Sequence, residues 1–337
     1  MSYSRGGGAA GLIAGVTAIS TAGKNVKEFN YRGFSVHELV QYASFEEVAY
    51  LLIYGELPSG RALKAYRARL VAMRGLPVKL KNILEQLPGS ANSMDVLRTG
   101  CSALGAMEPE TDERDQYQVA DRILSSLPSM LLYWGFFHSS NRRIETENNV
   151  ESFSGHFLTL LHGKPAKESA CRMLDALLIL NAEDKISYST FSARVTASTV
   201  AGFHAAITSA IGTLSGQLQG GASEEVMKLL SGFSSPDEAE QEILQLLARK
   251  ELVMGFVQRI HKDQPGPRSL LLKECSQRYA EETGNYLAYR IAERIEEVML
   301  RERKLYPNLA FYTAFASHLC GIPPSMVTPL FVFAQIS

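Results

Sequence analysis

The chain has 337 residues, with 34 Lys and Arg against 35 Asp and Glu, so its formal net charge is −1. At roughly 150 residues per domain, this length predicts about two domains. The near-zero charge excludes nucleic acid or an anionic membrane surface as the leading partner, and an apolar content of 46% excludes extensive disorder. We therefore predict a folded protein with a sizeable core.

The N-terminal stretch Ala9–Ile19 is apolar and follows Arg5, a weak resemblance to a signal peptide. The glycines at 6–8 and the Ser and Thr interruptions instead favour a short strand or hairpin. No apolar run reaches the ~20 residues that a membrane-spanning helix requires. The four cysteines lie far apart and form no C-x-x-C pair, which predicts free thiols in a reducing compartment. We expect a cytoplasmic protein that holds no metal.

Most of the chain has the apolar period of amphipathic helices, and we expect helices at about Gly60–Arg74, Phe153–Leu161 and Tyr286–Leu305. Another helix is predicted to begin at the N-cap Ser235, with Glu238 reaching back to complete a capping box. Alternating strand patterns are scarce beyond the first 35 residues. The predicted fold class is mainly α.

The stretch 190–223 differs from the rest of the chain because Arg194 is its only charged residue. It is rich in Ala, Ser, Thr and Gly. A helix that is apolar on all sides is typical of a large core or a subunit interface. The alternative, a membrane segment, is disfavoured by His204 and the frequent Ser and Thr. We expect a helix over about Thr190–Leu214 near the seam of a homodimer.

Matches to common catalytic and nucleotide-binding motifs in this chain lack the position or spacing that the motif requires. The string GGGAAG at 6–11 matches G-x-G-x-x-G, but only five residues precede it, so no strand can lead into the turn. His156 and His162 are six residues apart, which does not place two metal ligands on one helix face. These residues by themselves assign no activity.

Nine strings of residues follow one another in a known order and spacing over essentially the whole chain. They are YRGFSVHEL at 31–39, FEEVAYLLIYGELPS at 45–59, MDVLRTGCSALG at 94–105, GHFLTLLHGK at 155–164, STFSARVTAST at 189–199, AIGTLSGQLQGGAS at 210–223, GFVQRIHK at 255–262, YPNLAFY at 306–312 and TPLFVFA at 328–334. In these strings the chain resembles the citrate synthase family, most closely its 2-methylcitrate synthase branch.

The resemblance implies a helical subunit with a large domain at 1–219 plus 316–337 and a small domain at 220–315 that closes over the cleft. It also implies a homodimer, or a hetero-oligomer with an active paralogue. The implied ligands are acyl-CoA or CoA and a 2-oxo acid, with no permanently bound cofactor. The family reaction is a Claisen condensation: a base removes the α-proton of the acyl thioester, and the enolate attacks the ketone.

The acid and base positions of the family carry other residues here. Gln219 in QGGAS and Gln258 in GFVQ stand where the family has histidines, and Ala310 in PNLAFY stands where it has the carboxylate base. A glutamine has no proton that titrates near neutral pH, and an alanine cannot abstract one. Asp184 stands where a family histidine contacts the oxo acid, and it would place a negative charge against a dianionic substrate.

Several binding positions of the family are retained. Arg268 in GPRS matches the arginine that pairs with a carboxylate of the oxo acid, although one extra residue precedes it. Lys262 and Asn308 match positions on the CoA side. The loop matching the one that recognises the adenine of CoA consists of Leu252, Val253, Met254 and Gly255. The family continues for several dozen residues beyond the position of Ser337, in a tail with further carboxylate-binding arginines.

Three hypotheses remain open. The joint substitution at positions 184, 219, 258 and 310 favours a non-catalytic family member that acts as a ligand-binding or partner subunit. The alternative is an active transferase that condenses an acyl-CoA with a 2-oxo acid through another base, for which His261 is the nearest candidate. The third hypothesis is a structural dimer module whose cleft binds nothing.

Overall fold

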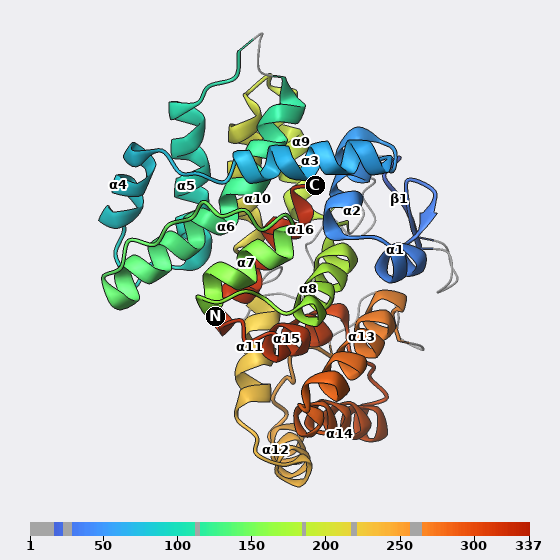
Figure 1. The fold of residues 1–337 in the computed structure, drawn as a ribbon. Helices are drawn as coiled ribbons and strands as arrows, with labels where there is room; N and C mark the ends of the chain where they lie inside the picture. The colour runs from blue at the N-terminus through green and yellow to red at the C-terminus, as the bar shows by residue number, and fades with distance from the viewer. Residues whose placement is uncertain (1–16, 23–28, 112–114, 184–186, 217–220, 257–264) are drawn as a thin grey trace.

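The computed structural model describes residues 17–22, 29–111, 115–183, 187–216, 221–256 and 265–337. Within these ranges the protein consists of α-helices and one small sheet, which confirms the predicted mainly α class (Figure 1). No helix in these ranges is both long enough and apolar enough to cross a lipid bilayer. The four cysteines are unpaired, as expected.

The sheet comes first and is antiparallel. Its strands are β1 (Ser20–Ala22), β2 (Phe29–Tyr31) and β3 (Phe34–Ser35), in that order. The turn between β2 and β3 contains Arg32 and Gly33, both at positive φ (47° and 88°), as a tight two-residue hairpin requires. The strand expected over 9–19 lies mostly outside the described residues, and β1 begins directly after it.

Eight helices follow the sheet. They are α1 (Val36–Tyr42), α2 (Phe45–Tyr54), α3 (Gly60–Ala72), α4 (Val78–Gln86), α5 (Ser93–Met107), α6 (Gln116–Ser140), α7 (Phe153–His162) and α8 (Glu168–Asn181). Helix α6 is buried on every side from Val119 to Trp134, because α2, α3, α4, α5 and α7 all pack against it. It forms the centre of this half of the molecule.

The second half of the chain is also helical. Its elements are α9 (Tyr188–Ser198), α10 (Phe203–Leu214), α11 (Gly221–Ser231), α12 (Pro236–Ala248), α13 (Pro267–Thr283), α14 (Tyr286–Arg303), α15 (Leu309–Leu319), a 3-10 turn (Pro324–Met326) and α16 (Val327–Gln335). Figure 1 shows α11 to α15 gathered in the lower part of the molecule, whereas α16 returns to its middle.

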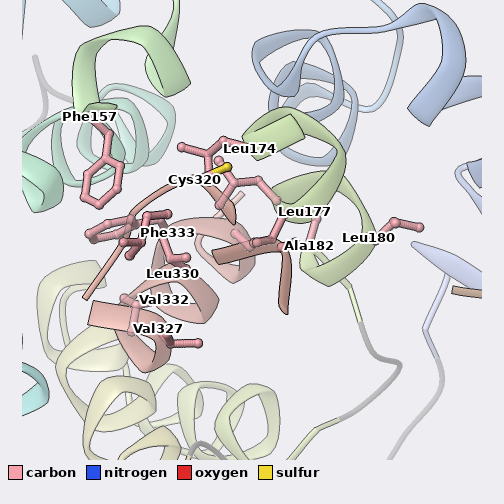
Figure 2. Close-up of a cluster of buried hydrophobic side chains, with 14 of the residues drawn as sticks. Phe157, Leu174, Leu177, Leu180, Ala182, Cys320, Val327, Leu330, Val332 and Phe333 are labelled. Carbon is pink, nitrogen blue, oxygen red and sulfur yellow. The ribbon is translucent and has the colours of Figure 1, made fainter. Parts of the chain in front are cut away.

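The return of α16 builds the core that joins the two halves. Figure 2 shows Leu330 and Phe333 of α16 pointing towards α7 and α8, where they meet Phe157, Leu174 and Leu177. The rings of Phe157 and Phe333 lie 5.8 Å apart in an edge-to-face arrangement. Since all five side chains are buried, this contact fixes the C-terminal helix against the N-terminal half.

Most helix positions agree closely with the sequence pattern. Helices α3, α7 and α14 start at the expected residues and end within two residues of the expected ends. At α12, Ser235 is the N-cap and accepts a hydrogen bond from the Glu238 N–H at 3.2 Å. The Glu238 carboxylate reaches back as predicted, but its closest partner is Ser234, and the Ser235 backbone contributes less. Ser234 offers two donors, its N–H and its hydroxyl, to the same carboxylate oxygen.

The single helix expected over Thr190–Leu214 is wrong. Two antiparallel helices, α9 and α10, occupy this stretch, and the hydroxyls of Ser192 and Ser209 lie 2.6 Å apart between them. The chain reverses at 199–202, where Val200 has a φ of 62°. The residues of the turn are as uncharged as those of the helices on either side, so the sequence pattern does not indicate where α9 ends and α10 begins.

Candidate functional site

The first turn of α15 carries two of the predicted site positions. Asn308 is the N-cap, and its side-chain oxygen accepts a hydrogen bond from the Phe311 N–H at 3.2 Å. Ala310 follows in the same turn and is partly buried. This turn contains no acidic side chain. The start of α15 is therefore well capped, but residue 310 provides no group that can accept a proton.

The predicted nucleotide loop is bound to this helix start through its backbone. The Asn308 N–H donates to the Gly255 carbonyl at 2.7 Å. Gly255 has a φ of 89°, and a Cβ at this position would lie 3.0 Å from the Phe311 side chain. Both the backbone conformation and the close approach require glycine here.

The other residues of this loop have contrasting environments. Leu252 is 72% exposed, whereas Val253 is buried and Met254 is partly buried against the core. Val253 therefore anchors the loop, while Leu252 presents an apolar side chain to the outside.

Ser269 connects the start of α13 to the start of α15. Its buried hydroxyl lies within hydrogen-bond distance of two carbonyls, those of Pro307 at 3.0 Å and Asn308 at 3.2 Å. The neighbouring residue in the first turn of α13 is Arg268. These contacts bring Arg268 into the same region as Asn308 and Ala310.

Arg268 points towards the C-terminal end of α8. Its Nη1 donates to the carbonyls of Glu183 at 2.9 Å and Leu180 at 3.3 Å. Its Cζ lies 4.9 Å from the centre of the Phe29 ring. A helix C-terminus carries partial negative charge, so the guanidinium is favoured there. Since Glu183 precedes Asp184 in the chain, Arg268 reaches the backbone next to another predicted site position.

Helix α8 is in turn connected to α15. The Asn181 side chain donates to the Thr313 hydroxyl at 3.1 Å, and both residues are buried. The C-terminal end of α8 and the first turns of α13 and α15 are thus joined by side-chain hydrogen bonds. One region collects Gly255, Arg268, Asn308 and Ala310.

Four predicted site residues lie outside the described parts of the chain: Asp184, Gln219, Gln258 and Lys262. Their roles stay predictions. The elements beside them are described, since α8 ends shortly before Asp184 and α11 begins directly after the segment that contains Gln219.

Sequence reasoning missed three residues of this region: Phe29, Tyr31 and Ser269. Tyr31 opens the string YRGFSVHEL, so its position could have been marked. Its partner could not, because its hydroxyl donates to the carbonyl of Ile179, 148 residues away, at 3.0 Å. No local pattern indicates a contact of that separation.

Helix α15 carries two titratable side chains with shifted pKa values, Tyr312 and His318. Burial, together with a hydrogen bond to Glu296, raises the pKa of Tyr312 well above its ordinary value, so this phenol keeps its proton. Burial lowers the pKa of His318, but this residue lies more than two turns beyond Ala310. Among the described residues, no group of three or more His, Cys, Asp or Glu side chains is placed to hold a metal ion.

A cavity of about 670 Å³ lies elsewhere, between α5 and α10. Arg98, Glu110 and His204 are among its lining residues, and none of the predicted site residues that the structure describes lines it. Glycine at 105 permits the close approach of the two helices, since a Cβ there would lie 2.6 Å from His204. This cavity is therefore separate from the region around α15.

Comparison with known proteins gives a consistent result. The family described as "Citrate synthase, C-terminal domain" matches residues 8–337. A 2-methylcitrate synthase from Shewanella oneidensis is 43% identical over 332 residues, which cover 98% of this chain and 88% of that protein. A citrate/2-methylcitrate synthase from Bacillus subtilis is 33% identical over 335 residues, which cover 97% and 88%.

Solved structures resemble the fold over a similar extent. The citrate synthase from Thermotoga maritima superposes with a TM-score of 0.81 at 30% identity, covering 97% of this chain and 87% of that one. The citrate synthase from Thermoplasma acidophilum, in a ternary complex with carboxymethyl coenzyme A and oxaloacetate, gives a TM-score of 0.84 at 23% identity, covering 96% and 87%. The helical architecture is thus shared along nearly the whole chain.

Proposed function

Because this chain belongs to the citrate synthase family, we propose that it is a member that binds an acyl-CoA and a 2-oxo acid without condensing them, acting as a binding or partner subunit. The observation that carries this proposal is the first turn of α15. Ala310 occupies the family's base position there, and the turn contains no carboxylate. A methyl group cannot remove the α-proton of a thioester.

The glutamines at 219 and 258 also argue against catalysis. Gln219 and Gln258 can donate and accept hydrogen bonds, but they have no proton that titrates near neutral pH. Loss of one positioned acid or base typically lowers a rate by ~10²–10⁴, and losses within one catalytic group do not simply add. With all three positions changed, we expect no measurable synthesis of citrate or methylcitrate.

Ligand binding is supported by two features that match binding positions of the family, Arg268 and the loop Leu252–Gly255. Arg268 provides a cation where the family pairs one with a carboxylate, and the loop Leu252–Gly255 is held against Asn308. The related Thermoplasma acidophilum enzyme was solved with a coenzyme A derivative and oxaloacetate. Both ligand classes are therefore the first to test on this chain.

The second candidate function is an active condensing transferase with a different base. It rests on the same binding positions, because an active enzyme would also need them. His261 is the nearest alternative base in the sequence and lies outside the described residues. The third candidate, a dimer module that binds nothing, needs no retained site at all.

We propose that the subunit assembles with a second copy or with an active paralogue. Phe191 and Val195 on α9 are about half exposed, in a stretch that has one charged residue. Exposed apolar side chains on one helix are typical of a subunit interface. Light scattering of the pure protein at micromolar concentration should give twice the subunit mass, and a stable monomer would contradict the homodimer.

We also propose the division into a large domain, 1–219 plus 316–337, and a small domain, 220–315. The grouping of α11 to α15 in one part of the molecule supports it (Figure 1). A cytoplasmic location is consistent with four unpaired cysteines.

The experiment that tests the function is thiol release from a panel of acyl-CoA thioesters mixed with 2-oxo acids. We expect release at the background rate. Turnover typical of enzymes, ~1 s⁻¹ or faster, would reject the non-catalytic proposal and favour a different base. Calorimetry with CoA and with oxaloacetate then separates the remaining two candidates, because a structural dimer module would bind neither ligand.

A further inference from the structure

The environment of Arg268 includes an aromatic side chain that no motif assigns to the site. The guanidinium carbon lies 4.9 Å from the ring centre of Phe29 on β2. Phe29 is only 9% exposed, so the contact is largely removed from water. A cation over an aromatic face is attracted by the quadrupole of the ring, more strongly where water is excluded. The guanidinium carbon therefore lies over the Phe29 ring at a distance typical of a cation–π contact.

A second residue of β2 fixes the carbonyls that Arg268 contacts. Tyr31 is fully buried, and its hydroxyl donates to the Ile179 carbonyl at 3.0 Å. The same hydroxyl accepts from the Glu183 N–H at 3.3 Å. Tyr31 thus holds the backbone at the end of α8, where Glu183 provides the carbonyl 2.9 Å from Arg268 Nη1.

The two aromatic residues are also placed relative to each other. The rings of Phe29 and Tyr31 meet edge to face, with centres 5.4 Å apart. Ser20 of β1 donates to the Glu183 side chain at 3.0 Å, which adds a second connection between the sheet and this residue. The sheet and the C-terminal end of α8 are therefore joined to each other, and Arg268 contacts both of them.

We propose that β2 is part of the 2-oxo acid site, with Phe29 and Tyr31 as positioning residues that hold the Arg268 guanidinium ready for a carboxylate. This inference rests on the proposed function, in which Arg268 pairs with the oxo acid. A guanidinium presents its N–H donors in one plane. The Phe29 ring and the α8 carbonyls together restrict where the guanidinium can lie. Holding the cation in advance reduces the ordering cost of binding.

The first test compares oxaloacetate binding by calorimetry on the full chain. In Phe29→Leu the cation–π contact is lost, and we expect the dissociation constant to rise roughly 3- to 10-fold. Phe29→Tyr keeps an aromatic face and should bind nearly as wild type. The matched control is Phe34→Leu on β3, a partly exposed phenylalanine of the same sheet, which should leave the affinity unchanged.

Tyr31→Phe tests the second positioning residue. It keeps the ring that packs on Phe29 and removes only the hydroxyl that contacts Ile179 and Glu183. We expect weaker oxaloacetate binding with unchanged affinity for CoA. A general loss of structure would lower both affinities, so equal weakening of both would reject a positioning role for Tyr31.

A second measurement needs no ligand. The side-chain Nε–Hε resonance of Arg268, assigned by its disappearance in Arg268→Lys, should move when Phe29 becomes leucine, because the ring current is removed. Phe34→Leu should leave it in place. If oxaloacetate does not bind the wild type but this resonance moves, the proposed function is wrong, whereas the contact by which Phe29 positions Arg268 is confirmed. If oxaloacetate binds wild type and Phe29→Leu equally, or the resonance does not move, the positioning proposal is overturned.

Discussion

Two acidic side chains, Glu46 of α2 and Asp175 of α8, share one buried region of the molecule. Glu46 accepts a hydrogen bond from the Phe153 N–H and lies 3.5 Å from Arg67, and Asp175 accepts one from the Ser154 hydroxyl. Burial and the charge of Glu46 raise the pKa of Asp175 to about 8. At the scale of residues, this carboxyl therefore links stability to pH.

We predict that the protein becomes less stable as pH rises from about 4 to about 8. The folded-state pKa of Asp175 lies above the unfolded value of 3.8, so the folded state binds more protons in this window. The free energy of unfolding should fall by up to about 1.4 kcal/mol per pH unit. Asp175→Asn should flatten this dependence in urea unfolding measured at several pH values. Asp95→Asn, at an exposed position of α5, should keep the wild-type slope.

At the scale of elements, one arginine holds an irregular segment in place. Arg74, just after α3, is 2% exposed and donates to backbone carbonyls of the segment that precedes α7. The shortest of these contacts is 2.5 Å, to Val150, and others reach Asn148 and Ser152. Burial lowers the pKa of Arg74 to about 10, so it stays charged at neutral pH. Arg74 thus supplies hydrogen-bond donors to carbonyls of a segment that belongs to no helix or strand.

Arg74→Leu should destabilise the protein by about 3 kcal/mol, because it leaves several buried carbonyls without a donor. Urea unfolding followed by circular dichroism measures this loss. Arg61→Leu, at an exposed position at the start of the same helix, should change the free energy of unfolding by less than about 0.5 kcal/mol. Equal effects of the two substitutions would show that Arg74 does not hold the segment.

At the scale of the whole molecule, the predicted catalytic positions 219, 258 and 310 lie in three separate segments of the chain. Ala310→Asp alone should leave thiol release at background, because no titratable partner stands at 219 or 258 to stabilise an enolate. We expect the triple change Gln219→His, Gln258→His, Ala310→Asp to release thiol faster than any single change. Adding Arg268→Met to the triple variant is the matched control, and it should raise the oxo-acid concentration needed for half-maximal rate.

The sequence determined the helical class, most helix ends and the family. Caps and apolar periods act within a few residues, so the starts of α3, α7, α12 and α14 could be predicted correctly. The alanine at 310, on which the proposed function depends, is likewise readable from the string PNLAFY. The break between α9 and α10 could not be read, because uncharged residues continue through the turn.

Only the tertiary structure decided what surrounds the retained side chains. Arg268 could be matched to a carboxylate-binding position, but its contacts with Phe29 and with Glu183, 85 residues away, depend on how α8, α13 and the sheet pack. The same holds for Ser269 and for the backbone bond that joins Gly255 to Asn308. A local pattern carries no information on such pairings, because their geometry is set by the burial of distant helices against one another.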